Sequence, residues 1–284
     1  MTSDENNTTT IKVGAAGKDV GGYDAAQLTR LQGDARQITA RYPHARSGLL
    51  PMLHLVQAED GYVSPTGIAF CADELGLTTA EVSAVATFYT QYKRHPNGEY
   101  TVGVCTNTLC AVMGGDAIWD GLTEHLGVGH DETTPDGKVT LERIECNAAC
   151  DYAPVVMVNW EFFDNQTPDS ARATVDKLQA GEKVVPTRGA DSVCSFKQMS
   201  RVLAGFTDGR ADEGVGAGEA TQRGTVLAKE RGWAAPEFPA ATPVPADATA
   251  TPATPATDAT PATGAPQSSA ERPATLPADT AKES

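Results

Sequence analysis

Four cysteines stand in two close pairs, and thiols at this spacing can hold a metal centre. Cys105 and Cys110 have four residues between them, and Cys146 and Cys150 have three, after a gap of 35 residues. Four thiolates bind a 2Fe-2S cluster or a single zinc ion, or they oxidise to two disulfides. Spacings wider than two residues suit the elongated cluster better than a single ion, but spacing alone leaves the three possibilities open.

The sequence around the cysteines predicts that each pair follows a β-strand. Residues 100–104 (YTVGV) run into Cys105, and residues 139–145 (VTLERIE) run into Cys146. Two neighbouring strands would bring the four thiols to one end of a sheet, where unpaired backbone N–H groups favour a sulfur-rich anion. Small and hydroxyl side chains between the cysteines let the backbone approach closely. The natural grouping gives one pair of thiolates to each iron.

Disulfides and zinc are weaker explanations of the same cysteines. The chain has six cysteines in 284 residues, and residues 1–22 are polar and Gly-rich without a secretory apolar run, so they are expected to be disordered. Clustered cysteines without an export signal are more often metal or redox sites than disulfides. Zinc knuckles usually carry glycines and basic residues around each pair, which this sequence lacks. A zinc-stabilised interaction module is kept as the alternative of another functional class.

Charge and hydropathy exclude several classes of partner. The formal net charge is -15, which argues against nucleic acid or an anionic lipid surface as the main partner. No window of the sequence approaches the roughly 20 apolar residues of a membrane span, so direct membrane insertion is not expected. We therefore expect a cytoplasmic protein that reaches a membrane only through its partners.

Residues 23–95 predict a helical bundle. Apolar residues recur with helical spacing, and short connections make neighbouring helices roughly antiparallel. Four helices are expected: one that ends before Pro43, one over 47–59, one from Ser64 to Gly76, and one from Thr78 onward. Ser64 followed by a proline, and Thr78 followed three residues later by Glu81, are helix-start signals.

Residues 96–182 predict a small α/β domain that contains both cysteine pairs. Strands are expected over 100–104, 139–145, 155–160 and 161–165, and helices over 116–127 and 167–181. This order of elements is compatible with a thioredoxin-like fold. Residues 183–206 are expected to form a partly ordered extension, and residues 207–284 a disordered Pro/Ala/Thr-rich tail. The predicted fold class is α+β, a four-helix bundle followed by a thioredoxin-like domain.

Four stretches of the chain together resemble a known family. They are FYTQYKRHPNGEYTVGVCTNTLC, GGDAIWDGL, IECNAACDYAPVVMVNWEFFDNQTPDSARATVDKL and the upstream LHLVQAEDGYVS. They resemble the peripheral 2Fe-2S subunit of respiratory complex I, the E subunit of NADH-quinone oxidoreductase, over residues 25–182. The resemblance implies a helical bundle and a thioredoxin-like ferredoxin domain with one 2Fe-2S cluster. It also implies the four cluster ligands, Cys105, Cys110, Cys146 and Cys150.

The same resemblance implies a role in electron transfer. In that family the protein docks on the larger flavin subunit, which binds NADH and FMN, and its cluster exchanges single electrons with the flavin. The chain would be a peripheral-arm subunit of a proton-translocating NADH:quinone oxidoreductase on the inner face of the cell membrane, with no catalytic residue of its own. The same module serves NAD-linked formate dehydrogenases and hydrogenases in their diaphorase unit, which is the alternative within redox chemistry.

The other conspicuous side chains have structural interpretations. Cys71 is predicted to be a buried, inert thiol, and Cys194 to cover a surface or contact a partner. Glu142 and Glu145 are predicted to lie on the solvated face of a strand. The five histidines show no ligand spacing. Packing between the two domains is predicted for three aromatic residues, Phe88, Tyr89 and Tyr92.

Overall fold

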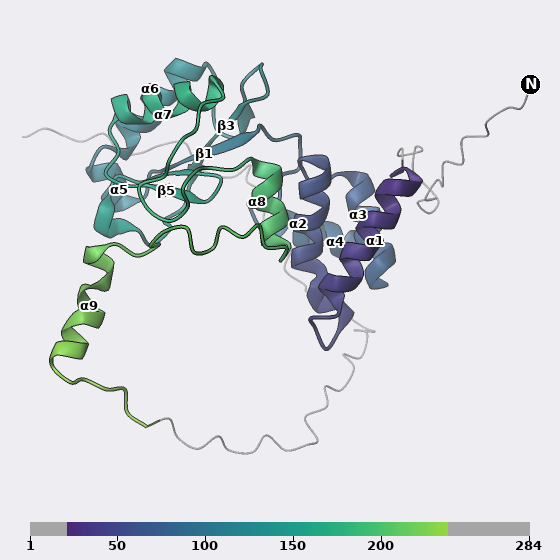
Figure 1. Cartoon of the computed structure of the whole chain (residues 1–284). Helices are drawn as coiled ribbons and strands as arrows, with labels where there is room; N and C mark the ends of the chain where they lie inside the picture. Colours follow the sequence, from purple (N-terminus) through teal and green to yellow (C-terminus); the bar gives the residue numbers. More distant parts are fainter. Residues whose placement is uncertain (1–21, 238–284) are drawn as a thin grey trace, which may run out of the picture. The chain divides into compact units, whose positions relative to one another are not determined.

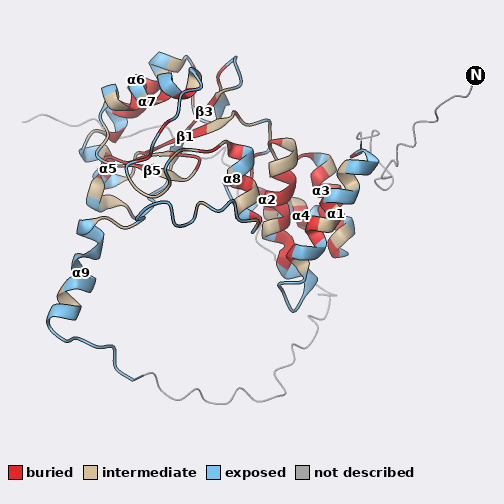
Figure 2. Cartoon of the chain, in the orientation of Figure 1, coloured by how far each residue is buried: buried red, intermediate tan, exposed pale blue. Residues whose placement is uncertain are grey.

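Two hydrophobic cores organise the structure, one among helices and one between a sheet and two helices. The computed structural model describes residues 22–237 (Figure 1). Residues 1–21 and 238–284, which were predicted to be disordered, lie outside the described residues. Buried residues follow the inner sides of the helices and the central strands (Figure 2). Within residues 22–237, no helix is both long enough and apolar enough to cross a bilayer.

The first core belongs to a helical unit. Its α-helices are α1 (Ala25–Thr39), α2 (Leu49–Asp60), α3 (Pro65–Leu75), α4 (Thr79–Phe88) and α8 (Phe196–Leu203), and a short 3-10 helix, η1 (Ala45–Gly48), precedes α2. The helix-start signals are confirmed. Ser64 accepts a hydrogen bond from the Gly67 N–H, and Thr78 and Glu81 form a reciprocal capping box. These caps satisfy N–H groups that the first turn of a helix leaves unpaired.

Helix α8 joins this core although it follows the whole sheet domain in the sequence. It packs against α2, where Gln57 donates a hydrogen bond to Ser200 at 3.4 Å, and Ala204 just beyond it is fully buried. The helical unit therefore has one helix more than the predicted four, and the predicted extension over 183–206 ends in packed structure. Sequence patterning missed this helix because its short apolar face is completed by residues distant in the sequence, those of α2 and Trp160, on whose ring Phe196 stacks at 5.8 Å.

The second core contains a five-stranded sheet. The strand order is β2 (Glu132–Thr133), β3 (Val139–Ile144), β1 (Tyr100–Cys105), β4 (Val156–Val158) and β5 (Glu161–Phe163). Its other elements are α5 (Thr108–Val112), α6 (Gly115–Leu126), η2 (Cys150–Tyr152) and α7 (Pro168–Gln179). β1 and β3 are parallel, with Tyr100 opposite Val139 and Cys105 opposite Ile144, and the other neighbours are antiparallel. The strands and helices predicted in this domain are confirmed.

Helices α6 and α7 cover one face of the sheet (Figure 1). Ile118 of α6 and Val175 of α7 are fully buried in the same core as Leu141 of β3. Side chains alternate along a strand, so Gly103 and Glu142 lie on the opposite face. That face meets the segment that joins the helical unit to β1.

Helix α9 (Glu219–Glu230) lies within the tail that was predicted to be disordered from residue 207. The prediction is wrong for residues 207–232. Arg210 donates a hydrogen bond to the carbonyl of Ser192 at 2.7 Å, and α9 follows. The amino-acid composition did not predict this ordered segment, because backbone and polar contacts hold it and no residue of α9 is buried.

The junction between the helical unit and the sheet is polar where aromatic packing was predicted. Phe88 and Tyr89 are 78% and 41% exposed, so the prediction is wrong for these two. Tyr92 is buried, but within the helical core, where its ring lies 4.9 Å from that of His54. Lys93 forms an ion pair with Glu142 instead, with side chains only 7% and 13% exposed. The solvated position predicted for Glu142 is therefore also wrong, because the joining segment covers its face of the strand. Glu145 is exposed, as predicted.

We expect Glu142→Ala to lower the free energy of unfolding at pH 7 by about 3–5 kcal/mol, because it leaves the buried Lys93 ammonium without a counter-charge. Urea denaturation measures this change. The matched control is Asp169→Ala, which removes a carboxylate that pairs with Arg172 at 3.8 Å but is 94% exposed. It should cost far less, because solvent screens such pairs. Equal losses in the two variants would contradict the role of the buried pair.

His54 makes the helical core sensitive to acid. Burial lowers its pKa from 6.5 to about 4, and its Nδ1 has no hydrogen-bond partner. Between these pH values the unfolded chain binds a proton that the folded chain does not bind. The free energy of unfolding should therefore fall by about 3 kcal/mol as pH drops from 6.5 to 4. His54→Phe keeps the ring contact with Tyr92 but removes this component, so the stability difference between wild type and variant should change by about 3 kcal/mol between pH 6.5 and 4. Parallel pH profiles of the free energy of unfolding in the wild type and the variant would contradict this role of His54.

Candidate metal centre

The ends of β1 and β3 position the first cysteine of each pair. Cys105 is the last residue of β1, and its N–H donates to the carbonyl of Val155 at 3.1 Å. Cys146 follows the end of β3 by two residues. Because the two strands are parallel and in register, both cysteines emerge at the same edge of the sheet. Cys105 is buried there and Cys146 is exposed.

Short helical turns position the second cysteine of each pair. Cys110 lies in α5 and is buried, and Cys150 opens η2 at intermediate exposure. Gly115, the first residue of α6, packs directly against the first loop. A Cβ at this position would lie 2.5 Å from the carbonyl oxygen of Cys105 and 2.9 Å from that of Cys110. Only glycine allows this close approach, which holds the two cysteines together.

The four cysteines line one small cavity, together with Asn147, Ala149 and Val155. All four are free thiols. The Sγ atoms of Cys146 and Cys150 are 3.5 Å apart, too far for a disulfide. Two thiolates on one tetrahedral metal, with bonds of about 2.3 Å, would lie roughly 3.7 Å apart. The second pair is therefore spaced as two ligands of one metal ion.

The donor set fits two pairs of ligands. A 2Fe-2S cluster takes two thiolates at each iron, whereas a structural zinc site takes four ligands round one ion. Cys146 and Cys150 are spaced as two ligands of one metal, and all four cysteines line the same cavity, so the residues present fit a 2Fe-2S cluster.

Two of the four thiols, those of Cys105 and Cys150, resist ionisation. Burial raises the pKa of Cys105 to about 11, with further contributions from its neighbours Cys110 and Cys146. The pKa of Cys150 is raised mainly by its hydrogen bond with Cys146. Four thiolates this close repel one another, so a metal must supply the compensating charge and displace the protons. Metal uptake at this site should therefore be favoured by higher pH.

Backbone N–H groups point at the sulfur atoms. The N–H of Ala148 donates to Cys146 Sγ at 3.4 Å, and the N–H of Asn107 donates to the Cys105 thiol. Such donors stabilise negative charge on sulfur. Sequence reasoning expected N–H donors at the sheet end but could not identify Ala148. Its φ of 55° lies in the left-handed region, which alanine rarely adopts, and no sequence signal marks it.

The two remaining cysteines lie outside this cavity. Cys71 is fully buried in α3, as predicted, and burial raises the pKa of its thiol. Cys194 is also buried, and its carbonyl accepts a hydrogen bond from Asn159 at 2.8 Å. Burial raises the pKa of Cys194 as well. Both thiols are therefore inert features of the fold.

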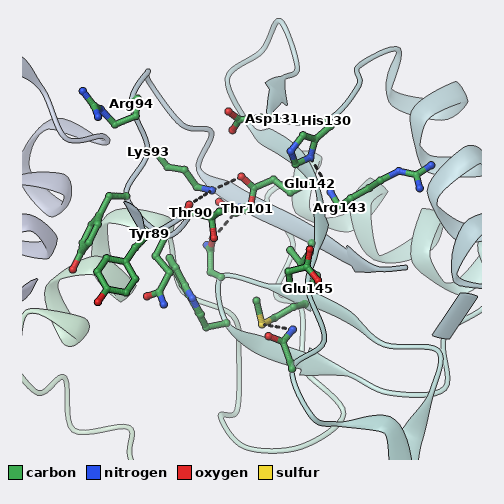
Figure 3. A pocket seen from close by; sticks show the side chains of 18 of the residues that line it. Tyr89, Thr90, Lys93, Arg94, Thr101, His130, Asp131, Glu142, Arg143 and Glu145 are labelled. Carbon is green, nitrogen blue, oxygen red and sulfur yellow. Dashed lines mark hydrogen bonds and ion pairs between the residues drawn. The ribbon is translucent and has the colours of Figure 1, made fainter. Parts of the chain in front are cut away.

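A cleft of about 550 Å³ lies beside the cysteine cavity, between the segment around Lys93 and the open face of the sheet. The Lys93–Glu142 pair spans it (Figure 3). Asn147 lines both the cleft and the cysteine cavity, and its amide contacts Met157 Sδ at 3.7 Å. The loop that carries Cys146 and Cys150 therefore has a cleft on one side. Sequence reasoning missed this cleft, because it depends on how the joining segment covers the sheet.

Comparison with known proteins gives matches in sequence and in structure. A sequence model of the thioredoxin-like 2Fe-2S ferredoxin family matches residues 35–179. The E subunit of NADH-quinone oxidoreductase from Mycobacterium tuberculosis is 64% identical over 220 residues, which cover 77% of this chain and 87% of that protein. NADH-quinone oxidoreductase subunit 2 of Thermus thermophilus is 38% identical over 148 residues, which cover 51% of this chain and 82% of that protein. Among solved structures, an NAD+-reducing NiFe hydrogenase superposes with a TM-score of 0.43 and 21% identity, over 47% of this chain and 23% of that chain.

We expect iodoacetamide to alkylate the cysteines of the metal-free protein in a fixed order at pH 8. Cys146 should react first, because its thiol is exposed. Cys105 should react far more slowly, because it is buried and its pKa of about 11 leaves little thiolate. Cys71 serves as the fully buried reference. Peptide mass spectrometry over time measures each rate, and equal labelling of Cys105 and Cys146 would contradict the geometry.

Proposed function

The chain belongs to the thioredoxin-like 2Fe-2S ferredoxin family, and we propose that it is the 2Fe-2S electron-transfer subunit of an NADH:quinone oxidoreductase. The observation that supports this most directly is the convergence of four free cysteines on one cavity at the end of β1 and β3. The chain is 64% identical to a relative named as the E subunit of that enzyme, of whose length it covers 87%.

The four cysteines would hold one 2Fe-2S cluster. We assign Cys105 and Cys110 to one iron and Cys146 and Cys150 to the other, an assignment supported by the 3.5 Å separation of the Cys146 and Cys150 Sγ atoms. A bound cluster supplies one-electron transfer at a potential that its surroundings set. The protein contributes the N–H donors of Asn107 and Ala148. It also buries Cys105 and Cys110, which keeps water away from this pair. No residue of this chain need act as acid, base or nucleophile.

The electron partner would be a flavin subunit that binds NADH and FMN, within the peripheral arm of a proton-translocating complex. The exposure of Cys146 and the intermediate exposure of Cys150 support this, because a partner must approach the centre closely to exchange electrons. The protein would sit on the inner face of the membrane through its partners. In this proposal residues 23–95 form the helical domain and residues 96–182 the domain that carries the cluster.

Low-temperature EPR of the dithionite-reduced protein, with iron quantified, tests this function. We expect a red-brown protein with two irons per chain and an EPR signal that appears on reduction. Cys146→Ser should abolish or severely weaken the cluster, because it removes one of two thiolates from an iron. Cys71→Ser is the matched control and should leave the spectrum intact, because Cys71 is buried in α3 away from the cavity. A colourless protein with one zinc per chain would overturn the proposal.

A further inference from the structure

Two segments that follow the cysteine domain in the sequence fold back together behind the Cys150 loop. We call residues 186–191 and 213–221 the brace. The N–H of Thr187 donates to the carbonyl of Phe162 in β5 at 3.0 Å, which attaches the first segment to the sheet. The N–H of Asp191 donates to Glu213 at 3.0 Å, which joins the two segments. The brace is therefore tied both to the sheet and to itself.

Arg188 is the centre of the brace. Its guanidinium pairs with Asp164 at 3.0 Å, and the two side chains are only 14% and 9% exposed. Its Nη1 donates to the carbonyl of Gly216 at 2.9 Å. The same guanidinium lies 4.2 Å from the ring centroid of Phe162 and 5.4 Å from that of Tyr152. One planar cation thus joins β5, the second brace segment and the Cys150 loop.

The second brace segment also contacts the Cys150 loop directly. The N–H of Ala220 donates to the Tyr152 hydroxyl at 3.1 Å. The hydroxyl of Thr221 lies 3.3 Å from Asp151 Oδ2. Gly218 packs so closely that a Cβ there would lie 2.1 Å from the Tyr152 hydroxyl oxygen. These contacts fix the two residues that follow Cys150.

The brace also reaches the apolar lining of the cysteine cavity. Phe162, the ring beneath Arg188, packs against the small hydrophobic cluster that contains Cys105, Cys110 and Val155. Tyr152 and Cys150 belong to the same short turn, η2. The brace therefore touches the surroundings of both cysteine pairs without adding a thiol or a histidine to them.

We propose that the brace holds the Cys150 ligand loop in place, with Arg188 and Tyr152 as positioning residues for the metal centre. This inference rests on the proposed function. Cys150 is the ligand of an exposed loop, whereas Cys105 and Cys110 are fixed by burial. Residues that orient ligands from behind typically change metal affinity or activity roughly 10–100-fold when substituted. The brace supplies such support from outside the matched family segment, residues 35–179.

A matched pair of glycine substitutions in the full chain tests the proposal. Gly218→Ala places a methyl group on the Tyr152 hydroxyl, and the φ of -76° at this position is accessible to alanine, so backbone strain does not contribute. Gly216→Ala is the control, because a Cβ there meets nothing within 4 Å. Arg188→Lys keeps the charge but loses the planar fork that reaches Asp164 and Gly216 together.

Two measurements apply to each purified, iron-loaded variant. The first is the rate of iron release to excess bathophenanthroline disulfonate, and the second is hydrogen exchange in peptides covering residues 214–222. Gly218→Ala and Arg188→Lys should release iron roughly tenfold faster than wild type and exchange faster in these peptides. Gly216→Ala should match wild type in both.

The outcomes separate this proposal from the proposed function. If iron release is unchanged in Gly218→Ala and Arg188→Lys, the brace does not position the ligand loop, even where hydrogen exchange is faster. If Gly216→Ala releases iron as fast as Gly218→Ala, the steric contact with Tyr152 is not the cause, and the proposal is overturned. If the wild type carries zinc, the proposed function fails, and the same variants then test the brace through zinc release.

Discussion

The parallel pairing of β1 with β3 is the constraint on which the metal centre depends. The register sets Cys105 opposite Ile144, so both strands end at the same level and both cysteine loops start there. A slip of one residue would turn the Cys105 side chain to the other face of the sheet. Gly103 permits the close pairing, since a Cβ there would lie 2.7 Å from Ile144 Cγ2. The position of the thiols is thus a consequence of strand register.

The centre is asymmetric, and this asymmetry separates stability from access. Cys105 and Cys110 are buried, and burial raises the pKa of the Cys105 thiol, so its ionisation depends on a bound cation. Cys146 is exposed, so a redox partner can approach that side of the site. Exposed loops are more mobile than the elements they connect. The accessible half of the site therefore needs support from elsewhere in the chain.

Local features of the sequence predicted most of the fold, and long-range contacts account for the errors. Caps such as Ser64 and the strands that run into the cysteines act over a few residues, so sequence alone revealed them. The burial of Glu142 and the packing of α8 each depend on a segment distant in the sequence, and periodicity carries no information about such pairing. The convergence of the two cysteine pairs was predicted, because strand ends were sufficient to infer it.

The distinction between local features and long-range contacts also applies within the metal site. The four cysteines proposed as ligands belong to two short motifs that are visible in the sequence, but the residues that surround them do not. Arg188 stands 38 residues beyond Cys150, in a stretch whose composition suggested only partial order. Its ion pair with Asp164 is almost fully buried, and such a pair is retained only where geometry satisfies both partners. This burial supports the proposed positional role of Arg188, because an ion pair needed only for surface solubility would lie in solvent.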